Sequence, residues 1–247
     1  MLGTVYNLIR RIKRSRLPGH NLINQMYYDP QTVILKLRDI DYIVIDDCKF
    51  YANDQIGMLQ RVEGNPWFRN IRPSDVVVDI GANIGAITIP LAKVAKKVYA
   101  LEPLFHEELW DNIRLNELHN VVVFPEGIGP LRQRRHYEFS SKCGVANTIP
   151  FKTLKEWVGH IDFIKVDCEG CEWGLEPEEF EGIREIRIEF HIRRSHKRTD
   201  RKKLQEWGRW LAQAGYNFDI ACGGSFGLYM PFTDCMVLNA SQKEADC

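Results

Sequence analysis

Residues 75–85 read Asp75-Val-Val-Val-Asp79-Ile-Gly81-Ala-Asn83-Ile-Gly85, and this stretch decides the fold. Its continuous apolar run predicts a strand that is buried on both faces, as in a parallel sheet. Gly81 and Gly85 follow where the chain must turn, and a glycine there lets the backbone approach a ligand without a Cβ in the way. The spacing matches neither GxGxxG nor a phosphate loop followed by Lys-Ser/Thr, so we expect neither nicotinamide nor ATP as the cofactor.

Strand and helix patterns alternate five times from residue 70 onward. We expect strands at 75–80, 97–101, 120–124, 161–167 and 184–190, closing strands at 216–221 and 234–238, and helices at 84–94, 105–118, 153–158, 176–180 and 199–214. This order predicts an α/β fold with a doubly wound, mostly parallel, seven-stranded sheet. Ligands of such folds bind beyond the C-terminal ends of the strands, near the point where strand order reverses.

A carboxylate stands directly after the second predicted strand. Glu102 follows Leu101 and precedes Pro103, about 20 residues beyond the glycine turn, where an acid can accept the hydroxyls of a ribose. The plainer interpretation is a surface carboxylate, which the position at the strand end disfavours. Strand, glycine turn, helix, strand and acid together indicate an adenosine-containing cofactor.

Three motifs in combination resemble the FkbM family of S-adenosylmethionine-dependent methyltransferases. They are residues 79–85, Glu102-Pro103, and Ile161-Asp-Phe-Ile-Lys165-Val-Asp167-Cys-Glu169-Gly170. The resemblance spans residues 70–192, and the closing strands fit the general Rossmann-like class I methyltransferase fold. It implies S-adenosyl-L-methionine as the cofactor and methyl transfer, usually to an oxygen on a sugar or another hydroxyl-bearing small molecule.

The resemblance also implies a cofactor site. The glycine-turn residues would line the methionine and ribose end, Glu102 would hold the ribose, and Asp167 and Glu169 would lie at the methyl-transfer end. The predicted cofactor-binding residues are Asp79, Gly81, Ala82, Asn83, Gly85, Glu102, Pro103, Glu126 and Asp167.

The fourth strand carries a charge in an otherwise apolar run. Lys165 is costly there unless it is paired, and we expect Glu189 on the next strand as its partner, either in a plain salt bridge or in a catalytic Lys165–Asp167–Glu189 group. Methyl transfer needs alignment, plus a base if the acceptor is a hydroxyl. Asp167 is the first candidate base and His191 the second, with a structural role for His191 left open.

The acceptor is less well specified. No Asn/Asp-Pro-Pro-Tyr follows the fourth strand, which favours oxygen over nitrogen. Lys plus Arg equals Asp plus Glu, 33 each, which excludes a generic polyanion binder. Basic residues nevertheless gather in two expected loops: Arg132, Arg134 and Arg135, and then Arg193, Arg194, Lys197, Arg198, Arg201, Lys202 and Lys203.

Basic loops beside a site favour an anionic acceptor. The plainer interpretation is that these basic residues begin a helix that is exposed to solvent. We take Glu169, Arg193 and Arg194 as candidate substrate-binding residues. Three hypotheses stay open. They are a sugar, glycan or small-molecule O-methyltransferase, an RNA methyltransferase that uses the basic rim and N-terminal arm, and a catalytically silent cofactor-binding or scaffold protein.

Residues 1–66 form an N-terminal extension and residues 67–247 the methyltransferase domain in this interpretation. The extension has a β-hairpin made of 32–38 and 42–45, a helix at 54–62, and a basic amphipathic start. Residues 1–16 either touch a membrane surface, nucleic acid or a partner, or form a solvated helix. No apolar run approaches the roughly 18 residues of a membrane span, and the start is no signal peptide, so we expect a cytoplasmic protein.

The seven cysteines are odd in number and irregular in spacing, which does not fit a secreted disulfide scaffold. Cys168 and Cys171 form the one CxxC motif. A second CxxC motif would indicate a zinc site, but the sequence has none. We therefore expect no metal and favour ordinary buried thiols. This double cysteine departs from the family pattern and leaves redox or metal behaviour open.

Overall fold

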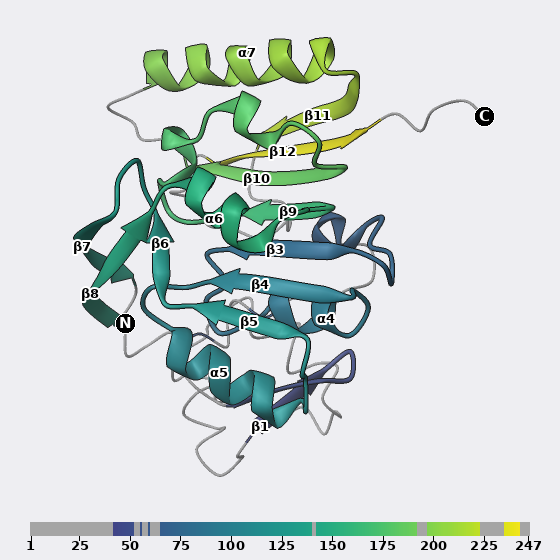
Figure 1. Cartoon of the computed structure of the whole chain (residues 1–247), viewed down its shortest axis with the longest axis vertical. Coiled ribbons are helices and arrows are strands. Elements are labelled where there is room, and N and C mark those ends of the chain that lie inside the picture. Colours follow the sequence, from purple (N-terminus) through teal and green to yellow (C-terminus); the bar gives the residue numbers. More distant parts are fainter. Residues whose placement is uncertain are drawn as a thin grey trace, which may run out of the picture.

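The computed structural model describes residues 42–51, 55, 59, 65–139, 142–191, 197–222 and 235–242. At its centre is a seven-stranded sheet with the order β11-β12-β10-β9-β3-β4-β5 (Figure 1). In that order the strands are Tyr216–Cys222, Cys235–Gln242, Glu185–His191, Phe163–Val166, Val76–Ile80, Lys97–Leu101 and Val121–Phe124.

Five neighbouring strands, β10 to β5 in that order, are parallel, and β12 runs antiparallel to both β10 and β11. The predicted seven-stranded, mostly parallel sheet is therefore confirmed. The chain runs outward from β3 through β4 to β5 and then returns to β9 on the other side of β3. Strand order thus reverses between β3 and β9, which marks their C-terminal ends as the expected ligand site.

Helices cover both faces of the sheet, as predicted. Val78 of β3 packs in one cluster with α6 (Phe151–Val158) and α7 (Lys197–Gln213), whereas Val77 packs with α4 (Thr88–Ala92). This alternation follows from the period of two in a strand. On the face of α4, α5 (His106–Leu115) buries Ala100 of β4.

The part of the chain that the structure describes has three short 3-10 helices. They are η2 (Pro66–Phe68), η3 (Glu172–Gly174) and η4 (Pro177–Phe180). The acidic helix expected at 176–180 is η4, and a capping box between Glu176 and Glu179 holds its start.

A second sheet of three strands was not predicted. It has the order β6-β8-β7, made of Glu126–Ile128, Lys142–Ile149 and Gln133–Phe139. Figure 1 shows it beside the edge where β4 and β5 end. The prediction that Arg134 and Arg135 lie in a loop is therefore wrong, because both belong to the edge strand β7. The first four residues of β7 are all exposed, so the strand carries no apolar alternation that periodicity could detect.

The described part of the N-terminal extension contains a hairpin, and one of its strands is the predicted segment 42–45. β1 (Tyr42–Ile45) pairs with the segment that follows it, β2 (Cys48–Tyr51), through a turn with positive φ at Asp46 and Asp47. The predicted partner arm, 32–38, lies outside the described residues, as do nearly all of the helix expected at 54–62 and the proposed membrane contact at 1–16.

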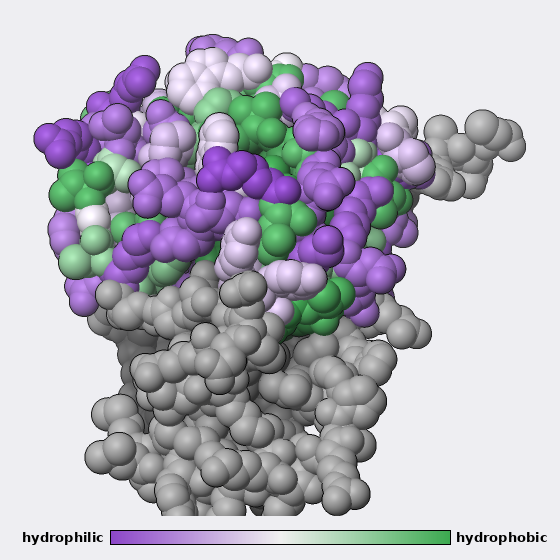
Figure 2. Space-filling model, turned by 90° about the horizontal axis from the view of Figure 1, so that it is seen from below, coloured by the Kyte–Doolittle hydropathy of each residue, from purple (hydrophilic) through white to green (hydrophobic). Residues whose placement is uncertain are grey.

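No helix in the described part of the chain is long and apolar enough to cross a membrane. Figure 2 views the molecule from below, and the coloured part of this face shows hydrophobic residues in small patches among hydrophilic ones. The described part of this face therefore offers no continuous apolar surface.

Candidate active site

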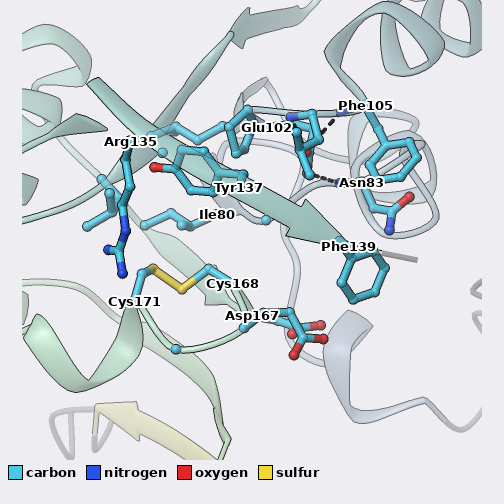
Figure 3. A pocket seen from close by; sticks show the side chains of 18 of the residues that line it. Ile80, Asn83, Glu102, Phe105, Arg135, Tyr137, Phe139, Asp167, Cys168 and Cys171 are labelled. Carbon is cyan, nitrogen blue, oxygen red and sulfur yellow. Dashed lines mark hydrogen bonds between the residues drawn. A yellow bond between two sulfur atoms is a disulfide. The ribbon is translucent and has the colours of Figure 1, made fainter. Parts of the chain in front are cut away.

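A pocket opens at the reversal point of the sheet. The ends of β3, β4 and β9 form its floor, and the three-stranded sheet forms its opposite wall (Figure 3). Its lining residues are Ile80, Gly81, Asn83, the segment 101–105, Gly127, Ile128, the segment 135–139, and the segment 167–171.

Gly81 is required by a close approach of two backbones. It has φ +77°, and a Cβ at this position would lie 1.8 Å from the carbonyl oxygen of Asp167. The ends of β3 and β9 therefore meet through bare backbone. Gly85 differs, because a Cβ there would meet Leu109 at 2.8 Å. Gly85 thus permits helix packing and does not line the pocket.

Glu102 is buried and nearly saturated with hydrogen bonds. Its Oε1 accepts from the amides of Leu104 and Phe105 at 2.7 and 3.0 Å, and its Oε2 accepts from the amide of Asn83 at 2.7 Å (Figure 3). A carboxylate offers about four acceptor positions, so one remains, on Oε2. Burial raises the pKa of Glu102 above its ordinary value, although these amides oppose the shift. A further donor would stabilise the charged form.

Lys165 and Asp79 form a buried ion pair across the reversal point. The Lys165 Nζ lies 3.1 Å from Asp79 Oδ1 and 3.7 Å from Asp167 Oδ2, and it donates to the carbonyl of Gly81 at 2.8 Å. Burial alone would lower the pKa of Lys165, but Asp79 and Asp167 outweigh it and raise the pKa. The lysine therefore stays charged and ties the end of β9 to the end of β3.

This pairing corrects the expected Lys165–Glu189 bridge. In the register of the sheet Lys165 stands opposite Asp79 on β3 and opposite Arg187 on β10, and residues directly opposite point to the same face. The charge of Glu189 contributes less to the raised pKa of Lys165 than do Asp79 and Asp167.

His191 ends β10 inside a cluster of three carboxylates. Glu172, which is fully buried, accepts the backbone amide of His191 at 2.8 Å and faces its Nδ1 at 3.0 Å. The Nε2 lies 3.4 Å from Glu169 and 3.7 Å from Asp167. Burial lowers the pKa of His191, but the hydrogen bond to Glu172 and the surrounding charges raise it to about 9. The ring is therefore a cation at neutral pH, which leaves Asp167 as the candidate base.

Cys168 and Cys171 are joined by a disulfide and line the pocket (Figure 3). The expectation of ordinary thiols is wrong for this pair. Two groups could offer three metal ligands each among the described residues: Cys168, Cys171 and Glu172, and also Asp167, Glu169 and His191. The disulfide withdraws the thiolates of the first group, and a protonated imidazole offers no lone pair in the second.

Some of the predicted site residues line the pocket, and others do not. The predicted residues that line the pocket are Gly81, Asn83, Glu102, Pro103, Asp167 and Glu169. The predicted residues that do not line it are Asp79, Ala82, Gly85, Glu126, Lys165, Glu189 and His191. Arg193 and Arg194 lie outside the described residues.

The sequence placed Arg135 in a basic loop beside the site, but it did not predict the strand β7 or the pocket residues Tyr137 and Phe139. Arg135, Tyr137 and Phe139 face the pocket from this strand (Figure 3). The hydroxyl of Tyr137 is so close to Gly127 that a Cβ on the glycine would lie 2.1 Å from it. Only Tyr137 and Phe139 alternate as aromatic residues, at the end of a segment dominated by charge, and two residues are too few to predict a strand.

Comparison with known proteins supports the fold. No protein-family model matches the chain, so membership of the FkbM family stays a prediction. A curated relative from Methanocaldococcus jannaschii, tRNA(Phe) (4-demethylwyosine(37)-C(7)) aminocarboxypropyltransferase, is 51% identical over 53 residues, which make up 20% of this chain and 21% of the relative. The match thus covers about a fifth of that relative's length.

Among solved structures, TYW2 of M. jannaschii in complex with AdoMet has a TM-score of 0.50 and 20% identity, over 81% of this chain and 84% of that one. Trm5b of Pyrococcus abyssi has a TM-score of 0.47 and 14% identity, over 83% of this chain and 56% of that one. The likeness to TYW2 shows that this chain has the Rossmann-like class I methyltransferase fold.

Proposed function

We propose that this chain binds S-adenosyl-L-methionine in the pocket and transfers its methyl group to a hydroxyl of RNA. The observation that carries the proposal is Glu102, a buried carboxylate with one acceptor position left, at the reversal point of a class I methyltransferase fold. The similar TYW2 structure is a complex with AdoMet.

The residues of the pocket fit this cofactor chemically. The remaining acceptor on Glu102 suits a ribose hydroxyl. Next to the pocket residue Gly127, Glu126 Oε2 is buried without a hydrogen-bond partner among the described residues, and such an acceptor calls for a donor such as an exocyclic amine. Asp167 and Glu169 place negative charge in the pocket wall, which complements a sulfonium and an ammonium group.

Asp167 is the group that we assign to the acceptor proton. The bound cofactor supplies an electrophilic methyl, and the protein must align the acceptor and remove its proton. Asp167 lines the pocket, with Lys165 and His191 each 3.7 Å from one of its oxygens. These two cations hold the carboxylate in position. They are positioning residues, and so is Glu172 behind His191.

The proposed RNA acceptor rests on two observations. Arg134 and Arg135 are exposed on β7, which borders the pocket, and cationic side chains beside a site favour a polyanion. The curated relative is named for a reaction on tRNA. A sugar or glycan hydroxyl is the second candidate, favoured by the FkbM-like motifs.

The identity of the transferred group needs a direct test. The curated relative is named as an aminocarboxypropyltransferase, and the sulfonium of the cofactor carries an aminocarboxypropyl group as well as the methyl. The protein is incubated with fractionated RNA, glycans and metabolites, using cofactor labelled either in the methyl or in the methionine carboxyl. We expect label in RNA from the methyl alone.

Asp167→Asn should lose about 10²–10⁴-fold in rate, the usual contribution of a general base, with a much smaller loss of cofactor affinity because Glu169 remains in the pocket wall. Carboxyl label in RNA would contradict methyl transfer, and methyl label in glycans would select the second candidate. Cofactor binding without transfer to any fraction would favour the scaffold alternative.

A further inference from the structure

The pocket wall beside Asp167 is a four-residue ring closed by sulfur. The Cys168–Cys171 disulfide closes it, and Glu169 and Gly170 between the two cysteines have φ of +56° and +117°. A non-glycine residue in this region persists only where its surroundings hold it. The cross-link therefore fixes a backbone shape that residues 168–171 would not keep readily by themselves.

This ring is tied to the two strand ends that form the site. The carbonyl of Asp167 touches Gly81, where a Cβ would lie 1.8 Å from it. On the other side, the amide of Gly170 donates to Glu172 Oε2 at 2.8 Å, while Glu172 Oε1 accepts the amide of His191 at 2.8 Å. The shape of the ring is thus coupled to the positions of both Asp167 and His191.

The disulfide lies at the pocket, and the other cysteines whose side chains the structure describes are free thiols. Both cysteines of the disulfide are half-buried and line the open pocket, whereas Cys48 is a buried free thiol and Cys143 an exposed one. A reduced state is also accommodated, because Cys168 Sγ lies 3.3 Å from Glu172 Oε2, where a thiol could donate to the carboxylate. Disulfides that solvent can reach are more labile than fully enclosed ones, and this half-buried disulfide stands in the wall of an open pocket.

We propose that Cys168 and Cys171 form a reversible dithiol–disulfide pair, and that its oxidation state sets the shape of the pocket beside Asp167. The thiolate of an external dithiol attacks one sulfur, the protein disulfide breaks, and the other cysteine leaves as a thiolate that takes a proton from water. The second thiol of the reductant then displaces the remaining cysteine. The protein gains two electrons and two protons, and the reductant leaves as a disulfide.

The oxidised ring is the competent state in this proposal, because it holds Asp167 in place. Reduction frees the ring, and a displacement of about 1 Å at a reacting group can lower a rate by about 100-fold. The effect on turnover rests on the proposed function, whereas the thiol chemistry and the loosening of the ring do not.

The test equilibrates the full chain with graded ratios of reduced and oxidised dithiothreitol, followed by alkylation, mass analysis and hydrogen exchange. We expect two thiols, mapped to Cys168 and Cys171, to titrate together, and the amides of residues 168–172 to exchange faster after reduction. With a working transfer assay, the rate should fall about tenfold to 100-fold on reduction and recover on reoxidation.

Cys143→Ser is the matched control and should leave the couple intact, whereas Cys168→Ser with Cys171→Ser should abolish it. Failure of these two thiols to titrate as a pair would overturn the proposal, and so would equal amide exchange in both states. Absence of any methyl transfer with an intact couple would instead count against the proposed function alone.

Discussion

Glu102 is buried together with three backbone amides that donate to it, which makes a conservative substitution informative. Glu102→Gln keeps the shape but loses the charge and one acceptor oxygen. We expect S-adenosylmethionine affinity to fall by about 1–3 kcal/mol, the cost of an unmatched polar group. Calorimetry on the folded variant measures the loss. Glu107→Gln, at an exposed position on α5, is the control, and unchanged affinity for Glu102→Gln would remove the cofactor from this position.

His191 makes stability depend on pH in a defined direction. Its pKa is raised from 6.5 to about 9 in the fold, mainly by Glu172 against the cost of burial. A raised pKa means that the contribution is fully present below about pH 6.5 and is lost as pH rises through 9. Each pKa unit corresponds to 1.36 kcal/mol, so the raised pKa of His191 contributes about 3 kcal/mol to the free energy of unfolding at low pH.

We therefore expect His191→Gln to unfold at lower denaturant than the wild type at pH 6, with the difference shrinking towards pH 10. Urea titrations at several pH values measure this. A difference that grows with pH would show that the ring is neutral in the fold and would restore it as a candidate base.

Position along the chain predicted Glu102 and Asp167 because a residue that ends a parallel strand must reach the shared edge of the sheet. It could not predict Glu172, which is fully buried although it stands in an acidic stretch that is typical of surface. Its carboxylate accepts the amides of Gly170 in the CxxC turn and of His191 at the end of β10, which are far apart in the sequence. The sequence also predicted the wrong partner for Lys165, because the register of the strands, which places Asp79 opposite Lys165, decides between Asp79 and Glu189.

Among the elements, β7 gives the site its polar wall, and its solvent-facing side can be tested separately from the pocket. Arg134 is exposed and does not line the pocket. If it contacts a phosphate, Arg134→Ala should reduce the slope of log affinity for RNA against log salt by about 0.7–0.9. Cofactor affinity should stay the same.

Arg209→Ala removes an equal charge from an exposed position on α7 and is the matched control. Filter binding at several salt concentrations distinguishes the two variants. Equal slopes for wild type, Arg134→Ala and Arg209→Ala would place the RNA away from β7 and weaken the proposed acceptor.

The buried strands of the large sheet were predictable because their apolar runs are long and continuous. The small sheet was not, since β7 exposes its first four residues and β8 includes Gly144 and Asn147, which are weak strand formers. The strand at 42–45 was predictable from its alternation, whereas its pairing with 32–38 stays a prediction, because that arm lies outside the described residues.

Across the whole molecule, the two halves of the sheet join at β3 and β9, and a charged pair is buried at this junction. Asp79 and Lys165 are 0% and 2% exposed, and Asp79 also accepts the hydroxyl of Thr88 at 2.6 Å. Buried pairs seldom add much stability over apolar residues, but removal of one partner leaves an uncompensated charge. The pair is therefore better explained by the site that it positions.

This explanation predicts that stability and function separate. Lys165→Met alone should destabilise the protein by about 3–5 kcal/mol, since the charge of Asp79 is left buried. Adding Asp79→Asn removes that charge while an oxygen remains for Thr88, so most of the lost stability should return. Transfer activity should not return, because Asp167 has still lost the cation 3.7 Å from its carboxylate.

Urea unfolding measures the first quantity and the transfer assay the second, with cofactor affinity as a check on the pocket. Recovery of both stability and transfer in the double variant would show that the pair serves only the packing of β3 against β9. A cost below about 1 kcal/mol for Lys165→Met would show that the site is wetter than its burial implies, because solvent-screened pairs contribute no more than that.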